Sequence, residues 1–359
     1  MKVRWDESGA TTAYANTCSV AVSAEEITLR FGAIARQDAA RREATVLVSN
    51  SVVMNPATAR RLALVMAQAM AQYRLRETPG GPAGAPIQAL MERISPEARL
   101  PLERLGALGC GYLLSGSFKM LRGSLLGNRY LMTLNKTLLG AQADQRILEV
   151  CRALRMPESL IAPFAERLAP ANYVHFGFEE GKQGCTYKVY MEYWTDWREE
   201  LEIKRRSEPF VGGYGYKWDP ASGRASALTR YTCHPLLPID ALLGRVANLY
   251  GTAAKPVQVG RSLLETVGRR LPVERMLYLE ADEEGSPRRS FDINLLRAKV
   301  LLGELHPLWM VMCEHYGIEP AAFHALFTPI RNEPFAHIQG GVDRDGADFI
   351  TIYYGAERH

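Results

Sequence analysis

The sequence lacks the features that would anchor this protein in a membrane, secrete it or bind it to nucleic acid. No stretch approaches the roughly 18 consecutive apolar residues that a membrane-spanning helix needs. Met1–Asp6 has charges but no apolar run behind them, so we expect no secretory signal. The net charge is only +4, and no Lys/Arg run of the kind that contacts nucleic acid occurs. We therefore expect a cytoplasmic protein that binds neither membranes nor nucleic acids.

Motifs for metals and for common catalytic sites are also missing. The six cysteines are scattered without the short spacings of a zinc site, so we expect free thiols. There is no Gly-rich phosphate loop, no nucleophile elbow and no His-Glu-x-x-His helix. The aspartate pairs of magnesium-dependent terpene enzymes are absent as well. We expect no metal site and no cofactor, and Mg²⁺ is the one alternative left open.

The sequence does contain a repeated pattern of short strands between residues 173 and 355. Four times, two runs of alternating apolar and polar residues flank an acidic turn that contains glycine, which is typical of β-hairpins. The turns are Glu179–Gly181, Asp219–Gly223, Asp282–Ser286 and Asp343–Gly346. Helix pairs follow the second and third hairpins, at about 238–250 with 256–269 and about 298–316 with 320–327. Residues 110–137 fit either a fifth hairpin or two short helices, and we favour the hairpin.

The alternation of hairpins and helix pairs predicts the fold class. Strands separated by helix pairs can stay antiparallel while each pair covers the apolar face of the sheet. Four or five hairpins supply eight to ten strands, enough to close a barrel and remove exposed edges. We predict an α+β fold, closed as an αββα-type barrel with helices outside, plus a small N-terminal βββα module. The alternative is an open sheet whose polar face meets solvent or that module.

The N-terminal module is separated from the barrel by a linker. Residues 77–87 are rich in glycine and proline, which neither helices nor strands tolerate well. We therefore predict a module over 1–76, the linker over 77–87 and the barrel-like domain over 88–359. In the module, strand patterns are followed by Asn55-Pro56, a favourable N-cap and first residue for a helix to about residue 76. We expect this module to dock a protein partner, a peptide substrate or a second copy of the chain.

Several short motifs connect the module to known sequences. Tyr14-Ala15-Asn16, Phe31-Gly32 and Val53-Met54-Asn55-Pro56 occur in this order. With them, about the first 65 residues resemble a short bacterial family of unknown function. The resemblance implies a shared module and brings no known chemistry.

The predicted strands of the larger domain have one face that is rich in polar groups. Side chains alternate along a strand, so Lys188, Tyr190 and Glu192 share one face of the strand that follows the first acidic turn. The remaining candidates chosen in this way are Arg230, Tyr231, Tyr278, Asp292, Asn294, His337, Gln339 and Tyr353. This set has more Tyr and His than a solvated face usually has. We expect it to line a lumen that binds a small molecule or a peptide.

Lys188-Val189-Tyr190 matches the Lys-x-Tyr strand motif of aromatic prenyltransferases. The hairpin-and-helix plan over roughly 88–355 also resembles the αββα barrel of that family. The resemblance implies that Lys, Arg and Tyr side chains grip an isoprenoid diphosphate and that Tyr rings shield the allylic cation. On this basis Lys188, Tyr190 and Arg230 are expected to hold the diphosphate. The other candidates for this cradle are Arg129, Lys217, Tyr231, Tyr278 and Tyr353.

Acidic residues on the same face depart from the family's pattern. Asp292, Glu192 and Glu280 would disfavour a diphosphate at close range. Asp292 or Glu192 could instead be the base that takes a proton from an aromatic acceptor. We predict prenyl transfer from an allylic diphosphate to an aromatic small molecule or peptide. The alternative is a non-catalytic protein that binds a peptide or protein in a bacterial biosynthetic pathway, because acidic lumen residues also suit a cationic ligand.

Overall fold

The computed structural model describes residues 15, 17–23, 25–38, 43–59, 61–62, 66, 94–181, 184–193, 206–225, 228–252, 254–272 and 276–358. The chain divides into two compact units, Met1–Pro79 and Gly80–His359. The predicted linker at 77–87 lies outside the described residues.

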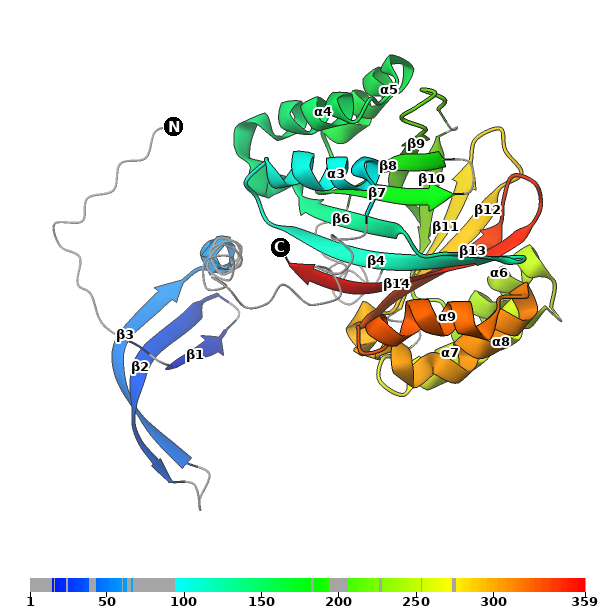
Figure 1. Cartoon of the computed structure of the whole chain (residues 1–359). Helices are drawn as coiled ribbons and strands as arrows, with labels where there is room; N and C mark the ends of the chain where they lie inside the picture. The colour runs from blue at the N-terminus through cyan, green and yellow to red at the C-terminus, as the bar shows by residue number, and fades with distance from the viewer. Residues whose placement is uncertain are drawn as a thin grey trace. The chain divides into compact units, whose positions relative to one another are not determined.

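The first unit contains a three-stranded antiparallel sheet (Figure 1). Its strands are β1 (Thr17–Val22), β2 (Ile27–Asp38) and β3 (Glu43–Met54), in that order across the sheet. Residues 56–59 are helical after β3. Oδ1 of Asn55 accepts a hydrogen bond from the backbone N–H of Thr58 at 2.8 Å, which confirms the predicted N-cap. Most of the predicted helix beyond this point lies outside the described residues.

The second unit alternates strands and helices as the sequence predicts. Its strands are β4 (Tyr112–Leu121), β5 (Ser124–Leu126), β6 (Arg129–Asn135), β7 (Tyr173–Gly181), β8 (Gly184–Glu192), β9 (Phe210–Trp218), β10 (Thr229–His234), β11 (Leu277–Glu283), β12 (Arg289–Asn294), β13 (Phe335–Val342) and β14 (Asp348–Arg358). Its α-helices are α3 (Pro96–Gly106), α4 (Ala143–Ala153), α5 (Glu158–Leu168), α6 (Ile239–Tyr250), α7 (Lys255–Gly268), α8 (His306–Tyr316) and α9 (Pro320–Phe327). Residues 110–137 form strands, as favoured over two helices. The helix predicted at 298–316 begins only at His306, after two 3₁₀ turns.

The strands of this unit close into an antiparallel barrel. The sheet runs from β14 through β13, β12, β11, β10, β9, β8, β7 and β6 to β4, with the short β5 attached to β4. β14 then pairs with β4, from Ile350 opposite Met120 to Arg358 opposite Leu113. This seam removes the two free edges that an open sheet would leave. The structure therefore confirms the closed barrel, and the open-sheet alternative is wrong.

Two layers of helices cover the outside of the barrel (Figure 1). α3, α4 and α5 pack on one side, where Phe164 joins Phe176, Val189 and Trp218 in a buried cluster. α6–α9 cover the other side, where Trp309 packs into the cluster that contains Phe291 and Ile338. Among the described residues, no helix has the length and apolar character needed to cross a membrane.

Several aromatic residues on the outer face of the barrel hydrogen-bond to the surrounding helices or helix ends through a hydroxyl or an indole N–H group. The hydroxyl of Tyr187 donates to the carbonyl of Glu97 at 2.7 Å, and Nε1 of Trp218 donates to the carbonyl of Leu154 at 2.8 Å. Each ring is buried while its one polar group is satisfied, a usual arrangement for Tyr and Trp in cores. A tyrosine on a strand of this protein therefore does not by itself indicate the lumen.

The assignment of faces on β10 and β11 was wrong for three residues. Tyr278 is fully buried on the outer side of the barrel, where it stacks on Phe291 and donates to Glu280 at 3.1 Å. Glu280 itself binds Arg245 of α6 at 2.9 Å. Arg230 is exposed and lies on the outer side of β10. The physical reason is that the lumen wall is apolar at this point, so polarity alone sorted the strands incorrectly. Leu277 and Leu279 line the cavity there, and they pack with Cys233 and Phe210.

Candidate active site in the barrel lumen

A cavity of about 490 Å³ lies inside the barrel. It is lined by most of the predicted site residues, namely Lys188, Tyr190, Glu192, Tyr231, Asp292, Asn294, His337, Gln339 and Tyr353. Arg129 of β6 also lines it, whereas Arg230 and Tyr278 do not. Side chains alternate along each strand, so every second one points into the barrel. Closure of the barrel then brings together side chains that are far apart in the sequence.

One end of the lumen is strongly basic. A second pocket of about 240 Å³ shares Arg129, Lys188 and Gln339 with the first. Its cationic lining residues are Lys119, Arg129, Lys188, Lys217, Arg288 and Arg344. The carboxylates that line it are Glu179, Asp343 and Asp345. The lining thus carries more positive than negative charge, and we refer to this part of the lumen as the basic end.

Glu179 is the central carboxylate of the basic end. Its Oε2 lies 2.6 Å from Arg129 and is also in contact with the ammonium group of Lys188. Burial favours the neutral acid, but Arg129, Lys188 and Lys119 outweigh this effect and hold the pKa of Glu179 well below its ordinary value. Glu179 is therefore ionised, and it neutralises only part of the surrounding charge.

The lysines of the basic end are poorly solvated. Burial lowers the pKa of Lys188 to about 7 and that of Lys119 to about 8, although Glu179 favours both ammonium forms. Burial also lowers the pKa of Lys217 well below its ordinary value. Among the described residues, Lys217 has no ion-pair partner. Because an unpaired buried ammonium group is costly, a bound anion would stabilise this end of the lumen.

Hydroxyl groups line both parts of the lumen. Thr351 lines the basic end, and its buried hydroxyl has no hydrogen-bond partner among the described residues. In the main cavity, Tyr190 and Tyr231 pack edge to face with ring centroids 5.6 Å apart. Burial raises the pKa of both tyrosines and raises that of Tyr353 to about 12, so all three remain neutral hydrogen-bond donors.

A glycine in β9 makes room for these rings. A Cβ on Gly215 would lie only 2.5 Å from the ring of Tyr190 and 3.1 Å from that of Tyr231. Any side chain at this position would therefore displace the aromatic wall of the lumen.

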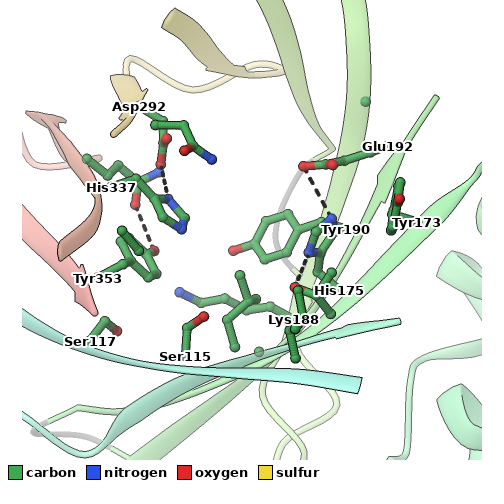
Figure 2. Close-up of a pocket in the computed structure, with 18 of the residues that line it drawn as sticks. Ser115, Ser117, Tyr173, His175, Lys188, Tyr190, Glu192, Asp292, His337 and Tyr353 are labelled. Carbon is green, nitrogen blue, oxygen red and sulfur yellow. Dashed lines mark hydrogen bonds and ion pairs between the residues drawn. The ribbon is translucent and has the colours of Figure 1, made fainter. Parts of the chain in front are cut away.

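Two histidine–carboxylate pairs face the cavity from opposite walls (Figure 2). On one wall, Nδ1 of His337 hydrogen-bonds Oδ2 of Asp292 at 3.2 Å. The ring of His337 also stacks on Tyr353, with centroids 4.4 Å apart. On the other wall, Nε2 of His175 lies 3.2 Å from Oε1 of Glu192. The lumen therefore combines a cluster of basic side chains at one end with two histidine–carboxylate pairs beside the main cavity.

Sequence reasoning missed parts of this site. Lys119 lies on β4, in the region where we favoured a hairpin but chose no lumen residue other than Arg129, although Ser115, Ser117 and Lys119 alternate in the sequence. Arg288 immediately precedes β12 and was not assigned to a face. His175 was not among the predicted site residues, because its pairing with Glu192 depends on the register of β7 and β8. Among the described residues, no group of three or more His, Cys, Asp or Glu side chains could hold a metal ion.

Comparison with known proteins adds one family for the first unit. Residues 1–80 match the family described as a protein of unknown function (DUF3467). No curated protein sequence is similar enough to this chain to count as a relative.

Solved structures that are similar to this chain include several aromatic prenyltransferases. One is 6-dimethylallyltryptophan synthase from Micromonospora olivasterospora in complex with DMASPP and Trp, with 13% identity and a TM-score of 0.45 over 68% of this chain and 82% of that one. Another is AnaPT from Neosartorya fischeri, with 10% identity and a TM-score of 0.37 over 68% and 78% of the two chains. NotF prenyltransferase has 10% identity and a TM-score of 0.34 over 68% and 80%.

Proposed function

We propose that the barrel binds an allylic diphosphate at its basic end and transfers the prenyl group to an aromatic acceptor in the main cavity. The observation that carries this proposal is the surplus of basic over acidic side chains that line the basic end. Lys217 has no ion-pair partner among the described residues, and Lys188 and Arg129 share the single carboxylate of Glu179. A dianionic or trianionic head group would satisfy these cations through charge-assisted hydrogen bonds.

The residues proposed to hold the diphosphate differ in one respect from the prediction. Lys188 and Tyr190 line the lumen, but Arg230 is exposed on its outer side. Arg129 takes the proposed role of Arg230, since it pairs with Glu179 and lines both the basic end and the main cavity. The faces of Tyr190 and neighbouring tyrosine rings would stabilise the allylic cation that forms when the diphosphate leaves.

The acceptor would occupy the main cavity, beside the two histidine–carboxylate pairs. A cavity of about 490 Å³ lies in the size range of small-molecule sites. Asn294 and Gln339 line it and offer amide groups that could orient the acceptor. Asp292 and Glu192 supply the basic groups that removal of the ring proton requires. No step of this proposal needs a metal ion, and Mg²⁺ bound with the diphosphate stays an untested alternative.

Thermal stability in the presence of anionic ligands tests the proposal. We expect dimethylallyl or geranyl diphosphate to raise the melting temperature of the full chain more than inorganic pyrophosphate does. Lys188→Met should largely abolish the shift, because it removes one charge-assisted hydrogen bond between the protein and the diphosphate. Such a bond contributes about 1.5–3 kcal/mol. Lys255→Met is the matched control, since Lys255 is exposed on α7, away from the lumen. The absence of a shift with every diphosphate would contradict the proposal.

The second candidate function is binding of a protein or peptide without catalysis. The observation that favours it is the exposed apolar surface of the first unit. Val20, Val22 and Leu47 are 58%, 73% and 66% exposed. Exposed apolar residues gathered on one small sheet often mark an interaction surface. Capture of a peptide or a protein by residues 1–79, together with no response to any diphosphate, would support this second function over transfer.

A further inference from the structure

We propose that Nε2 of His337 is the group that removes the ring proton of the acceptor and that Asp292 positions His337 for this step. The inference rests on the proposed prenyl transfer. It replaces the carboxylates as the direct base, because the geometry of the two histidine–carboxylate pairs differs in one decisive respect.

The first pair leaves one ring nitrogen of the histidine available. Nδ1 of His337 hydrogen-bonds Asp292 at 3.2 Å, which places the proton of the neutral ring on Nδ1. Nε2 of His337 has no partner among the described residues, and the other edge of the ring points into the lumen (Figure 2). Stacking on Tyr353 at 4.4 Å fixes the plane of the ring. A fixed imidazole with a free lone pair beside the cavity is the arrangement that a general base needs.

The second pair does not offer such a nitrogen. Nδ1 of His175 is engaged by Oγ1 of Thr133 at 2.8 Å. Nε2 lies 3.2 Å from Oε1 of Glu192, forms no hydrogen bond among the described residues and is buried. Neither nitrogen of His175 is therefore accessible to an acceptor in the cavity.

The groups around His337 also suit this role. Asp292 of β12 is the carboxylate beside it, and it would stabilise the imidazolium that forms. Tyr353 of β14 is neutral, because burial raises its pKa to about 12. Tyr190 and Lys188 of β8 and Tyr231 of β10 line the same cavity, and Asn294 pairs with His337 in the sheet. Asp292 is thus the carboxylate that would compensate the positive charge of the imidazolium. It binds Nδ1, whereas the reacting nitrogen is Nε2.

In the proposed reaction, the C–O bond of the allylic diphosphate breaks, and the diphosphate leaves with the bonding electrons. A π electron pair of the aromatic acceptor forms the new bond to the allylic carbon. Nε2 of His337 then takes the proton from the substituted ring carbon, and the C–H electron pair restores aromaticity. The imidazolium returns the proton to water when the products leave.

Turnover of the full chain with dimethylallyl diphosphate and a panel of indoles and phenols tests the inference. We expect His337→Ala to lower kcat by about 10²-fold or more, with binding of the diphosphate unchanged. Added imidazole should restore part of the rate, and a ring-deuterated acceptor should react more slowly in this variant.

Asp292→Asn should lower kcat less than His337→Ala does and should move the acid limb of the pH–rate profile, since Asp292 acts only through His337. His315→Ala is the control, because His315 forms a similar pair with Asp348 at 2.8 Å outside the lumen lining.

The outcomes separate this inference from the proposed function. Turnover that persists in His337→Ala, with no imidazole rescue and no isotope effect, overturns the role of His337 and leaves prenyl transfer standing. A wild-type protein that turns over no acceptor overturns both. A loss of kcat in His337→Ala that imidazole rescues, with His315→Ala unchanged, supports the inference.

Discussion

At the scale of single residues, the basic end of the lumen opposes folding of the free protein. A lysine buried without a carboxylate partner opposes folding, because the charged form loses its hydration. Lys217 is in this position among the described residues, close to Lys188 and Arg288, which add repulsion, and to Glu179 and Glu283, which only partly offset it. We expect such a buried lysine where a bound anion offsets the free energy lost when the ammonium group is desolvated.

We predict that Lys217→Met stabilises the free protein. The expected gain in the free energy of unfolding near pH 7 is about 1–3 kcal/mol, measured by chemical denaturation. Between the lowered folded pKa of Lys217 and the ordinary lysine value, the unfolded chain binds a proton that the folded chain has released. Stability of the wild type therefore rises with pH in this range, and the rise should be smaller in the variant. The variant should also bind pyrophosphate more weakly; unchanged stability and binding would contradict this account.

Glu179 has the opposite effect on the basic end. Its folded pKa is depressed, so its contribution to stability is present above the ordinary pKa of glutamate and is lost as the pH falls below it. We predict that Glu179→Gln lowers the free energy of unfolding at neutral pH by about 3–5 kcal/mol, because it leaves Arg129 and Lys188 buried without a carboxylate. Inorganic pyrophosphate should restore much of the loss. Denaturation with and without pyrophosphate measures both effects, and a variant that the anion does not rescue would argue against an anion site.

At the scale of elements, the seam between β14 and β4 determines whether the lumen exists. Gly116 of β4 pairs with Tyr354 of β14, and the tyrosine ring lies over the glycine. A Cβ on Gly116 would come within 2.5 Å of that ring. The glycine therefore allows the ring to cover the seam and join the apolar layer beneath α6–α9.

We predict that Gly116→Ala destabilises the barrel by about 1–3 kcal/mol, because the ring of Tyr354 must move away from the seam. Gly106→Ala is the matched control. Gly106 ends α3, and a Cβ there would meet nothing within 4 Å, so this variant should be neutral or gain at most about 1 kcal/mol. Thermal unfolding of both variants tests the comparison. Equal melting temperatures would show that the seam tolerates a side chain at this point.

The elements themselves could be predicted from the sequence because their signals are local. Acidic turns with glycine and alternating flanks are set by neighbouring residues, so the four hairpins formed by β7–β14 were predicted from their turns. The 3₁₀ turns before α8 were missed, since the apolar spacing through 298–316 is similar to that of one continuous helix. The ambiguity at 110–137 has the same origin: Leu and Met suit both a helix and a strand whose outer face is apolar.

The side chains that face the lumen were predictable where a strand has one apolar and one polar face. Lys188, Tyr190 and Glu192 were assigned correctly on this basis, and so were Asp292 and His337. Tyr278 and Arg230 were not, because the lumen wall at β10 and β11 is apolar while the outer side carries polar groups. Which face is inside depends on where the helices pack, and a single strand does not encode that.

At the scale of the whole molecule, closure of the barrel turns local alternation into a polarised lumen. Cations from β4, β6, β8 and β9 meet at one end, although they are far apart in the sequence. The histidine–carboxylate pairs come from β7 with β8 and from β12 with β13. The two halves of the proposed reaction, release of an anion and loss of a proton, would thus be served by different walls of one cavity.

The first unit presents a different kind of surface. Val20, Leu29 and Val52 lie opposite one another on β1, β2 and β3, so they form one row on one face of the sheet. Val20 and Val52 are 58% and 44% exposed. The neighbouring row, Ser19, Arg30 and Ser51, is polar and lies on the opposite face. The sheet therefore has an apolar face that suits association with a protein, a peptide or a second copy of the chain.

We predict that a chain beginning at Gly80 folds and binds pyrophosphate like the full chain but no longer self-associates. The barrel unit has its own buried clusters and its own closed sheet, so its folding should not require residues 1–79. In the full chain, Val20→Asp with Val52→Asp should abolish self-association, because it places charges in the apolar row. Ser19→Asp with Ser51→Asp adds the same charge to the opposite face and should leave association unchanged. Light scattering measures the mass of each variant.

A full chain that is monomeric at all concentrations would exclude a second copy as the partner. A truncated chain that precipitates would show that the barrel needs the first unit in order to fold.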